Sequence, residues 1–315
     1  MNSNPFGATS TTDDVLAGLD LSGKRVLITG VSAGIGVETA RALSAHGAQL
    51  VGAVRDIAKA RQATTHIPAI ELVELDLGSL ASVRACAEAL VKDGRSFDLV
   101  IGNAGVMATP FGHTADGFET QFGTNHLGHF LFINRLLPLL KSGSRVILLS
   151  SAGHRESDVV LDDPNFARTD YTPFSAYGRS KTANILFAVE FDRRHKDKGI
   201  RAAAVHPGGI RTELGRHVGQ EGIDKRLADV NELARAEGRP EFRWKTIPQG
   251  AATTVWAAAK ASAEEIGGRY CEDCQVAEPV PAGEQRPNGV RPYAVDPERA
   301  KALWALSEEM VGERF

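Results

Sequence analysis

Residues 24–45 read KRVLITGVSAGIGVETARALSA, and this stretch decides the fold. An apolar run at 26–28 is followed by the glycine-rich turn TGVSAGIG at 29–36 and then by apolar residues at helical spacing. The pattern predicts a buried strand, a tight turn and a helix. Glycines let the backbone approach a pyrophosphate, and a helix start offers unpaired N–H groups. The turn therefore favours a dinucleotide site over a merely structural bend.

The same unit recurs along the chain. Short apolar strands without alternation are buried on both faces, and strands that alternate with helices indicate crossover connections in a parallel sheet. The prediction is an α/β fold, a Rossmann-type doubly wound parallel sheet in a single domain with a C-terminal extension. Further strands are expected at 50–54, 70–75, 99–101, 145–149 and 201–205, and helices at 80–92, 118–140 and 176–194.

No break in composition divides the regular part of the chain. We expect a flexible lead-in at 1–20, one domain at 21–280 and a C-terminal extension at 281–315. Two polar or charged segments, 154–173 and 213–248, follow predicted strands. Ligands of open α/β sheets bind beyond the carboxyl ends of the strands, so these segments are predicted to be substrate loops.

The extension has two parts. Residues 279–292 are rich in proline, glycine and charge and are predicted to be a linker. Pro297–Val311 shows an amphipathic helical pattern, and we expect it to pack on the surface or on another subunit.

Composition limits the function. The chain has 315 residues and a net charge of −3, which argues against a nucleic-acid partner. Three cysteines do not make a disulfide framework and favour a reducing compartment. The chain shows neither a secretory signal nor a run of 18 apolar residues. We expect a soluble, cytoplasmic protein without a membrane anchor.

The second predicted strand ends in Val54-Arg55-Asp56. An acid at such a position accepts hydrogen bonds from the ribose of NAD, whereas an arginine pairs with the 2′-phosphate of NADP. Arg55 favours NADP(H) over NAD(H), although a solvated arginine with Asp56 as the ribose ligand stays open.

Tyr177 and Lys181 lie four residues apart on a predicted helix, and so on one face. A phenol is a poor acid or base at neutral pH, but a neighbouring cation lowers its pKa toward the working range. The pair is suited to proton transfer, although this spacing is common by chance.

Together these motifs resemble the short-chain dehydrogenase/reductase family over about residues 21–280. The resemblance rests on motifs that follow successive strands in the family's order: the turn at 29–36, Asp76-Leu77, Asn103-Ala104-Gly105, Asn125, Ser150-Ser151, Tyr177 with Lys181, and Pro207-Gly208 through Thr212. It implies an enzyme that acts on CH–OH or C=O groups with a nicotinamide cofactor.

The resemblance implies a catalytic tetrad of Asn125, Ser151, Tyr177 and Lys181. Tyr177 would be the acid in reduction and the base in oxidation, and Ser151 would hydrogen-bond the substrate oxygen. Lys181 would hold the nicotinamide ribose and lower the tyrosine pKa, and Asn125 would anchor a water. The family uses the second serine of such a pair, so Ser150 is expected to be structural.

The resemblance also implies the cofactor contacts. Arg55, Tyr177 and Lys181 would contact the cofactor. Its pyrophosphate, adenine half and carboxamide end would also be contacted by Gly30, Ser32, Gly34, Ile35, Gly36, Asp76, Leu77, Asn103, Ala104, Gly105, Pro207, Gly208, Ile210 and Thr212. The position where NAD-preferring relatives carry an acid is Val54 here, followed by Arg55.

The run NHLGHF at 125–130 and the long gap between Ser151 and Tyr177 are similar to the retinol-dehydrogenase and WW-domain-oxidoreductase branch. The expected substrate is a carbonyl or alcohol, and apolar residues in the two loops favour a bulky hydrophobic one. Relatives commonly pair their long helices between subunits, so a homo-oligomer, dimer or tetramer, is possible unless the extension blocks it.

Alternatives stay open. One is a nonenzymatic NADP-binding sensor or scaffold, although no member of the tetrad is missing; another is an NAD-dependent alcohol dehydrogenase. A nucleotide-sugar epimerase would show a different glycine spacing. His126 and His129 are interpreted as helix-packing residues rather than metal ligands, since no cysteine or carboxylate pair accompanies them. Cys271 and Cys274 have redox spacing, but we expect no metal site.

Overall fold

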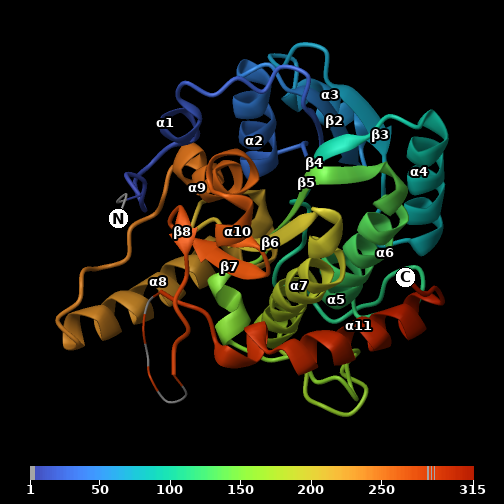
Figure 1. Ribbon diagram of the computed structural model, residues 1–315. Helices are drawn as coiled ribbons and strands as arrows, with labels where there is room; N and C mark the ends of the chain where they lie inside the picture. Colours follow the sequence, from blue (N-terminus) through green and yellow to red (C-terminus); the bar gives the residue numbers. More distant parts are fainter. Residues whose placement is uncertain (1–3, 282–283, 285, 287) are drawn as a thin grey trace.

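The computed structural model describes residues 4–281, 284, 286 and 288–315. The strands are β1 (Arg25–Thr29), β2 (Gln49–Val54), β3 (Glu71–Glu74), β4 (Phe97–Gly102), β5 (Leu140–Leu149), β6 (Arg201–His206), β7 (Arg269–Glu272) and β8 (Gln275–Val276). They form one eight-stranded sheet in the order β3-β2-β1-β4-β5-β6-β7-β8 (Figure 1). Only the β7–β8 pair is antiparallel. The order reverses between β1 and β4, so the predicted doubly wound parallel sheet is confirmed.

Helices cover both faces of this sheet (Figure 1). They are α1 (Thr12–Leu16), α2 (Gly34–Ala45), α3 (Ile57–Ala63), α4 (Leu80–Asp93), α5 (Thr120–Phe122), α6 (Gly128–Arg135), α7 (Pro173–His195), α8 (Gly219–Ala236), α9 (Ile247–Val255), α10 (Ala263–Ile266) and α11 (Pro297–Val311). α2 packs with α9 and α1, whereas α4 packs with α6 and α7 packs with α11.

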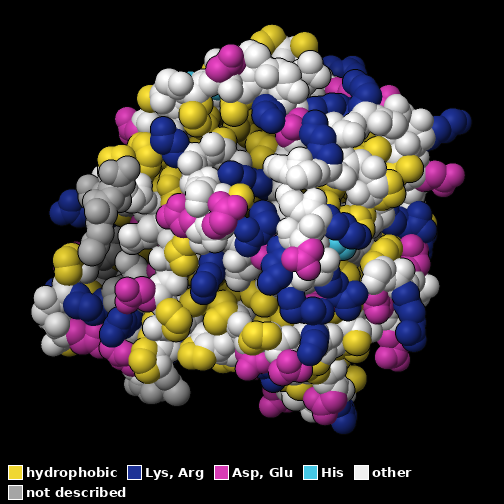
Figure 2. All heavy atoms as spheres, in the orientation of Figure 1, with side chains coloured by type: hydrophobic (Ala, Val, Ile, Leu, Met, Phe, Trp, Pro, Cys, Tyr) yellow, Lys and Arg dark blue, Asp and Glu magenta, His cyan; other side chains and the backbone are white. Residues whose placement is uncertain are grey.

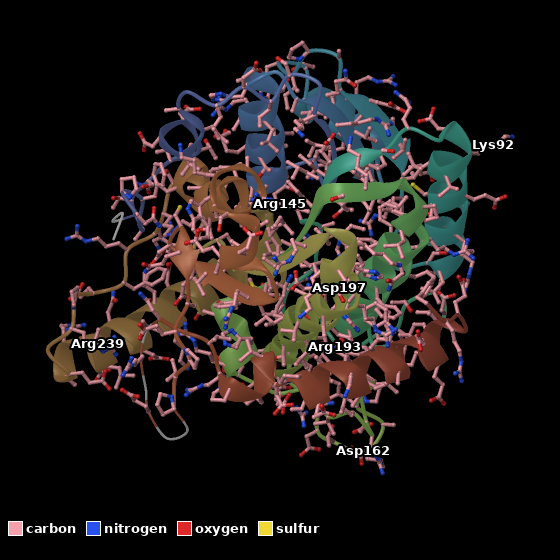
Figure 3. All side chains as sticks on the ribbon, viewed as in Figure 1. Lys92, Arg145, Asp162, Arg193, Asp197 and Arg239 are labelled. Carbon is pink, nitrogen blue, oxygen red and sulfur yellow. The ribbon has the colours of Figure 1, made fainter. Side chains whose placement is uncertain are left out.

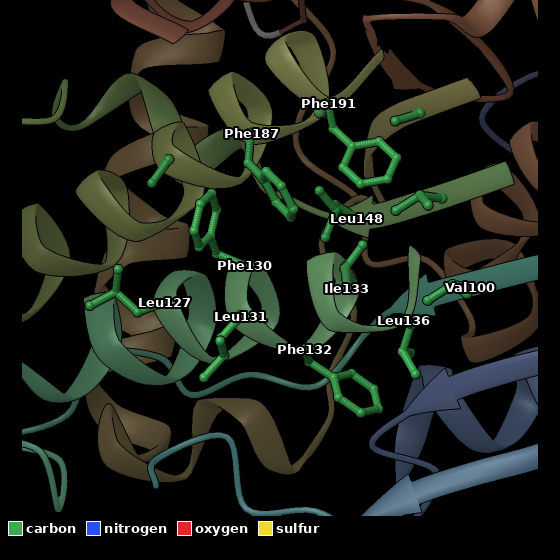
Figure 4. Close-up of a cluster of buried hydrophobic side chains, with 14 of the residues drawn as sticks. Val100, Leu127, Phe130, Leu131, Phe132, Ile133, Leu136, Leu148, Phe187 and Phe191 are labelled. Atoms are coloured by element: carbon green, nitrogen blue, oxygen red, sulfur yellow. The ribbon is translucent and has the colours of Figure 1, made fainter. Parts of the chain in front are cut away.

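Two apolar cores lie on the two sides of the sheet. Along β1, Val26 and Ile28 belong to the core under α2 and α9, and Leu27 belongs to the core under α6 and α7. Successive strand residues point to opposite faces, so an uninterrupted apolar strand supplies both cores at once. Figure 4 shows the second core, in which the rings of Phe130 of α6 and Phe187 of α7 have centroids 5.3 Å apart.

One predicted helix is wrong in its bounds. The stretch 118–140 divides into α5, a π-helical turn (Gly123–Leu127), α6 and a 3-10 turn (Leu137–Leu139). Pro138 lies in the last of these turns, and Leu140 then pairs with Phe97 in the sheet. A proline cannot continue the helical hydrogen bonding, and the pairing with β4 extends β5 toward its amino end beyond the predicted 145–149.

The lead-in at 1–20 also differs from expectation. A capping box of Thr11 and Asp14 starts α1, and Val15 and Leu16 are fully buried. Two apolar side chains on one turn anchor the segment to α2 and α9, and so the described part of the lead-in is ordered.

The C-terminal extension packs on its own chain. α11 has the predicted bounds and lies along α7 (Figure 1). The segment expected to be a linker is bridged at Pro279 and Val290, and Val290 is buried; residues 282, 283, 285 and 287 of that segment lie outside the described residues. The extension is thus part of the apolar core.

Charged side chains of both signs are mixed on the face seen in Figure 2, in keeping with a net charge of −3. Lys92 and Asp162 extend from the periphery, whereas Arg145 lies within the fold (Figure 3). Its guanidinium donates to the carbonyls of Ala257 and Ala261 and so holds the π-helical turn that follows α9 to β5.

We expect that Trp304→Ala will lower the free energy of unfolding by about 3–5 kcal/mol, because the indole of Trp304 is 2% exposed and packs on Phe130 and Phe187. Denaturant unfolding measures the change. Lys301→Ala, an exposed position on the same helix, is the matched control and should cost less than about 0.5 kcal/mol. If Trp304→Ala lowered the free energy of unfolding by less than about 1 kcal/mol, α11 would contribute little to the stability of the core.

Candidate active site

The glycine turn between β1 and α2 is closely packed. Gly30 has φ +77°, and a Cβ there would lie 2.9 Å from the Cα of Ala104; a Cβ on Gly36 would collide with the carbonyl of Gly30. No side chain fits at either position. The turn brings main-chain atoms, without side chains, to the surface where a phosphate would bind.

The strand β4 holds this turn in place. Asn103 donates from Nδ2 to the carbonyls of Thr29 and Gly30, at 2.8 and 3.0 Å, and the Ala104 N–H donates to the Thr29 hydroxyl at 3.0 Å. The Asn103 side chain, expected near the adenine ribose, is therefore bound to the turn itself.

The start of α2 has no side-chain cap. Its N-cap is Ala33, whose methyl group cannot accept a hydrogen bond from the first-turn N–H groups. Ser32 and Ile35 are half-buried beside it, and the methyl group of Thr212 lies 3.2 Å from the Cβ position of Gly34. Unpaired amides, a glycine cradle and the helix dipole together suit a bound pyrophosphate.

At the end of β2, Arg55 and Asp56 have different environments. Asp56 is the N-cap of α3 and accepts from the Lys59 N–H at 2.9 Å. Arg55 is exposed and has no salt bridge to another residue in the described parts of the chain. The carboxylate already has a structural partner, whereas the guanidinium remains available for an anion.

The adenine-side motif follows β3. Asp76 accepts from the Gly78 N–H at 2.9 Å, which closes a short turn before α4. Leu77 is buried. Its carbonyl lies so close to Gly128 that a Cβ added to Gly128 would collide with that carbonyl. Asp76 stays half-exposed at the carboxyl edge of the sheet.

Three of the four tetrad side chains lie around the start of α7. Lys181 Nζ lies 5.6 Å from the ring centroid of Tyr177 and donates to the Leu149 carbonyl at 3.0 Å. The Ser151 hydroxyl acts on the Tyr177 phenol and lowers its pKa. α7 begins earlier than predicted because Pro173 and a Thr172–Ser175 capping box initiate it.

The pKa values of this pair reflect burial. Burial raises the pKa of Tyr177 to about 12, opposed by its hydrogen bond with Ser151, and burial lowers the pKa of Lys181 to about 8. The shift of Tyr177 is opposite to the lowering expected from the lysine. Desolvation of the phenolate exceeds the attraction of an ammonium group that is itself buried and directed at a carbonyl.

Asn125 lies in the π-helical turn and is fully buried. Its amide both accepts from and donates to the main chain of Val106, at 2.8 and 2.9 Å, and it also donates to Ser180. A Cβ on the neighbouring Gly105 would lie 3.0 Å from Asn125 Oδ1 and 3.5 Å from Lys181 Nζ. Asn125 thus fixes the loop after β4 against the tyrosine–lysine helix. π-helical turns of this kind recur at functional sites.

The two serines after β5 have different partners. Ser150 is buried and donates to the Lys181 carbonyl at 2.8 Å, which is a structural contact. Ser151 is half-exposed, accepts from the Gly153 N–H at 3.0 Å and contacts the tyrosine. This geometry supports the prediction that Ser151 and not Ser150 faces a substrate.

The loop after β6 is covered by the returning segment 239–246. Lys245 packs its side chain on Gly208 and pairs with Asp273 at 2.5 Å, and the ring of Phe242 lies on Gly209. The main chains of Ile210 and Lys245 form an isolated parallel β-bridge. Pro207 and Thr212 complete this loop, and Thr212 brings it to the glycine turn. Neither Phe242 nor Lys245 has a sequence motif that would place it there.

The histidines next to Asn125 link structural elements. His126 bonds to Ser307 of α11 at 2.8 Å, and His129 joins the Asn125 carbonyl to the Thr29 hydroxyl, each at 2.9 Å. No group of three metal-binding side chains occurs among the residues that the structure describes. Cys271 and Cys274 are free and buried, and burial raises the pKa of both thiols.

Comparisons with known proteins agree with this arrangement. A family model described as short chain dehydrogenase matches residues 24–222. The chain is 42% identical to short-chain dehydrogenase/reductase prx1 of Penicillium roqueforti, covering 98% of this chain and 92% of the relative. It is 37% identical to human retinol dehydrogenase 14, covering 93% and 87%.

A solved structure of an uncharacterised protein from Mycobacterium paratuberculosis superposes with a TM-score of 0.75 at 34% identity, covering 98% of this chain and 99% of that one. Among the described residues, no helix has the length and apolar character needed to cross a membrane.

Burial raises the pKa of all four tyrosines of the chain: Tyr171, Tyr177, Tyr270 and Tyr293. We expect the folded protein to show little phenolate absorbance at about pH 10, where free tyrosine is half ionised. The unfolded chain ionises first, so stability falls as the pH rises above about 10. Titration of the folded protein against the same protein in denaturant measures this, with circular dichroism to verify folding. Half-ionisation of the folded protein at pH 10 would contradict the burial.

Proposed function

The chain belongs to the short-chain dehydrogenase family, and we propose that it moves a hydride between NADP(H) and a bulky hydrophobic carbonyl or alcohol. It is an oxidoreductase that acts on CH–OH or C=O groups with a nicotinamide cofactor. The observation that carries the proposal is the meeting of Ser151, Tyr177 and Lys181 at the carboxyl edge of the sheet, which also bears the glycine turn.

The residues fit the cofactor in three places. The uncapped start of α2 would hold the pyrophosphate, and Arg55 would pair with a 2′-phosphate. The loop from Pro207 to Thr212 would meet the carboxamide. When bound, the nicotinamide supplies the hydride in reduction and accepts it in oxidation.

Within this chain, Tyr177 would donate its phenolic proton to the substrate oxygen during reduction and take it back during oxidation. Ser151 would donate a hydrogen bond to the same oxygen as negative charge develops on it. Lys181, held by the Leu149 carbonyl, would bind the nicotinamide ribose and favour the phenolate. Asn125 would hold the loop after β4 and anchor a water beside the lysine.

The proposed class of substrate is supported by the aromatic side chains on the loops beyond the sheet. Phe111 is 51% exposed, and its ring lies tilted against that of Tyr171 with the centroids 5.0 Å apart. Phe242 packs edge-on to Trp244 at 5.1 Å. These rings come from the segments after β4, β5 and β6, which all end at the same edge. Aromatic rings on the loops beyond the carboxyl ends of the strands support a large apolar substrate.

Two further expectations belong to this proposal. The three cysteines are free, which supports a cytoplasmic location. α11 covers part of α7, so an oligomer that pairs through α7 would use only the surface that α11 leaves open.

We expect Arg55→Ala to weaken NADPH binding about 10–100-fold and to leave NADH binding nearly unchanged, because the lost bond is to the 2′-phosphate alone. Fluorescence titration with both nucleotides measures this. The control is Arg95→Ala, an exposed arginine at the opposite edge of the sheet that pairs with Glu71 and Asp93. Equal losses for both nucleotides, or no loss, would exclude Arg55 as the phosphate ligand and direct attention to Asp56.

We expect Tyr177→Phe to lower turnover about 10²–10⁴-fold and Ser151→Ala about 10²–10³-fold, with nucleotide affinity retained. The assay follows NADPH consumption with a panel of aldehydes and ketones. In the oxidation direction the rate should rise with pH as the phenolate forms. Ser151→Ala should move that rise to higher pH, because the Ser151 hydrogen bond lowers the pKa of Tyr177.

The matched control is Ser150→Ala, which removes only the bond to the Lys181 carbonyl. Turnover near that of the wild type is expected for it. A Ser150→Ala loss as large as that of Ser151→Ala would reverse the assignment of the two serines. Full turnover by Tyr177→Phe would overturn the proposed mechanism.

A further inference from the structure

The turn that carries Ser151 is bound to a segment from the far end of the sequence. We propose that His154 is a positioning residue, which ties the Ser151 main chain to residues 290–295 and so holds the Ser151 hydroxyl against Tyr177. The inference deepens the proposed function and rests on it. Neither His154 nor residues 290–295 belongs to the predicted tetrad or to the predicted cofactor contacts.

The hydrogen bonds of His154 define its tautomer. Nδ1 lies 2.7 Å from the Ser151 carbonyl, which can only accept, and Nε2 receives the Arg291 N–H at 3.1 Å, which can only donate. The ring therefore carries its proton on Nδ1. It is fully buried, and burial lowers its pKa to about 4, so the neutral form that makes both bonds is the one present near neutral pH.

Further bonds fix the main chain of this turn. The His154 carbonyl accepts from the Tyr293 hydroxyl at 2.7 Å and from the Thr182 hydroxyl at 3.1 Å. Thr182 follows Lys181 on α7. One carbonyl thus joins the serine turn to the catalytic helix and to the C-terminal segment.

The position of the turn is transmitted directly to the tyrosine. A Cβ on Gly153 would lie 2.8 Å from two ring carbons of Tyr177, and a Cβ on Gly178 would lie 2.8 Å from the Gly153 carbonyl. The main chain of the turn therefore packs directly on the Tyr177 ring of α7. A shift of the turn would change the Ser151–Tyr177 geometry, and errors of about 1 Å at reacting groups cost about 10²-fold in rate.

The C-terminal side of this bridge is itself anchored. Val290 and Ala294 are 2% and 0% exposed. Beyond them, Arg299 donates to the Val159 carbonyl at 2.7 Å and pairs with Asp158 at 2.8 Å. Residues 290–295 are thus held on the core by buried apolar side chains and are followed by a helix that Arg299 fixes to the loop after β5, so they can support the serine turn.

Three variants separate the two bonds of the ring. His154→Ala removes both. His154→Asn retains an amide donor at the place of Nδ1, and His154→Gln retains an acceptor at the place of Nε2. Tyr293→Phe removes the hydroxyl on the C-terminal side. The control is His195→Asn on α7, a histidine 7% exposed whose ring nitrogens have no hydrogen-bond partner in the described parts of the chain.

Two readouts are taken on the full chain. The first is kcat and KM for NADPH with benzaldehyde, decanal and phenanthrenequinone as carbonyl probes. The second is hydrogen–deuterium exchange of a peptide that covers residues 151–156. We expect His154→Ala to lower kcat about 10–100-fold with KM for NADPH within about threefold, and to speed exchange of that peptide. The kcat of His154→Asn should be higher than that of His154→Gln, because asparagine retains the hydrogen bond to the Ser151 carbonyl.

Tyr293→Phe should speed the same exchange, and His195→Asn should change neither readout. Wild-type kcat and wild-type exchange in His154→Ala would overturn the proposal. The proposal would also be overturned if the loss of kcat in His154→Ala were explained by a smaller fraction of folded protein and if His154→Asn did not restore kcat. If the wild type reduces none of the probes while it binds NADPH, the proposed substrate class fails. The proposal then depends on the exchange alone, and unchanged protection in His154→Ala and Tyr293→Phe would overturn it.

Discussion

The structure depends on burial of the central strands on both faces. Strands such as β1, with side chains in both cores, can be covered only when helices lie on both sides, and crossover helices make the strands parallel. Parallel strands end at one edge. The glycine turn, Asn103, Ser151 and the Pro207 loop follow four different strands, and this constraint alone brings them together.

The same burial determines the electrostatics of the site. Tyr177 and Lys181 lie in a region that disfavours both of their charged forms, which raises one pKa and lowers the other. The protein offsets part of this cost, because Lys181 donates to a main-chain carbonyl and the Ser151 hydroxyl lowers the pKa of the phenol. The catalytic groups are thereby held in one arrangement, since few alternative partners exist at such depth.

Local patterns predicted the sheet, the glycine turn and the position of Tyr177 and Lys181 on one helix, because each depends on neighbours within a few residues. The break in the stretch 118–140 was not predicted, since it results from the pairing of Leu140 with Phe97. The contacts of Phe242, Lys245 and His154 were not predicted for a similar reason, although Phe242 was among the apolar loop residues that favoured a bulky substrate. Their partners, Gly209, Asp273 and Arg291, are distant in sequence or lie in loops whose course no periodicity defines. The sign of the Tyr177 shift was wrong because sequence shows the neighbouring cation but not the depth of burial.

The packing of residues 290–311 on α7 also bears on protein synthesis. The region that matches the family model, 24–222, leaves the ribosome before Arg291, Tyr293 and Ser307 are made. The nucleotide-binding half of the sheet can form while translation continues, because domains fold as their own contacts emerge. The turn of Ser151 and the π-helical turn of Asn125 instead wait for partners at Arg291 and Ser307. The hydrogen bonds from Arg291 and Ser307 to these turns can therefore form only after the rest of the sheet has been synthesised.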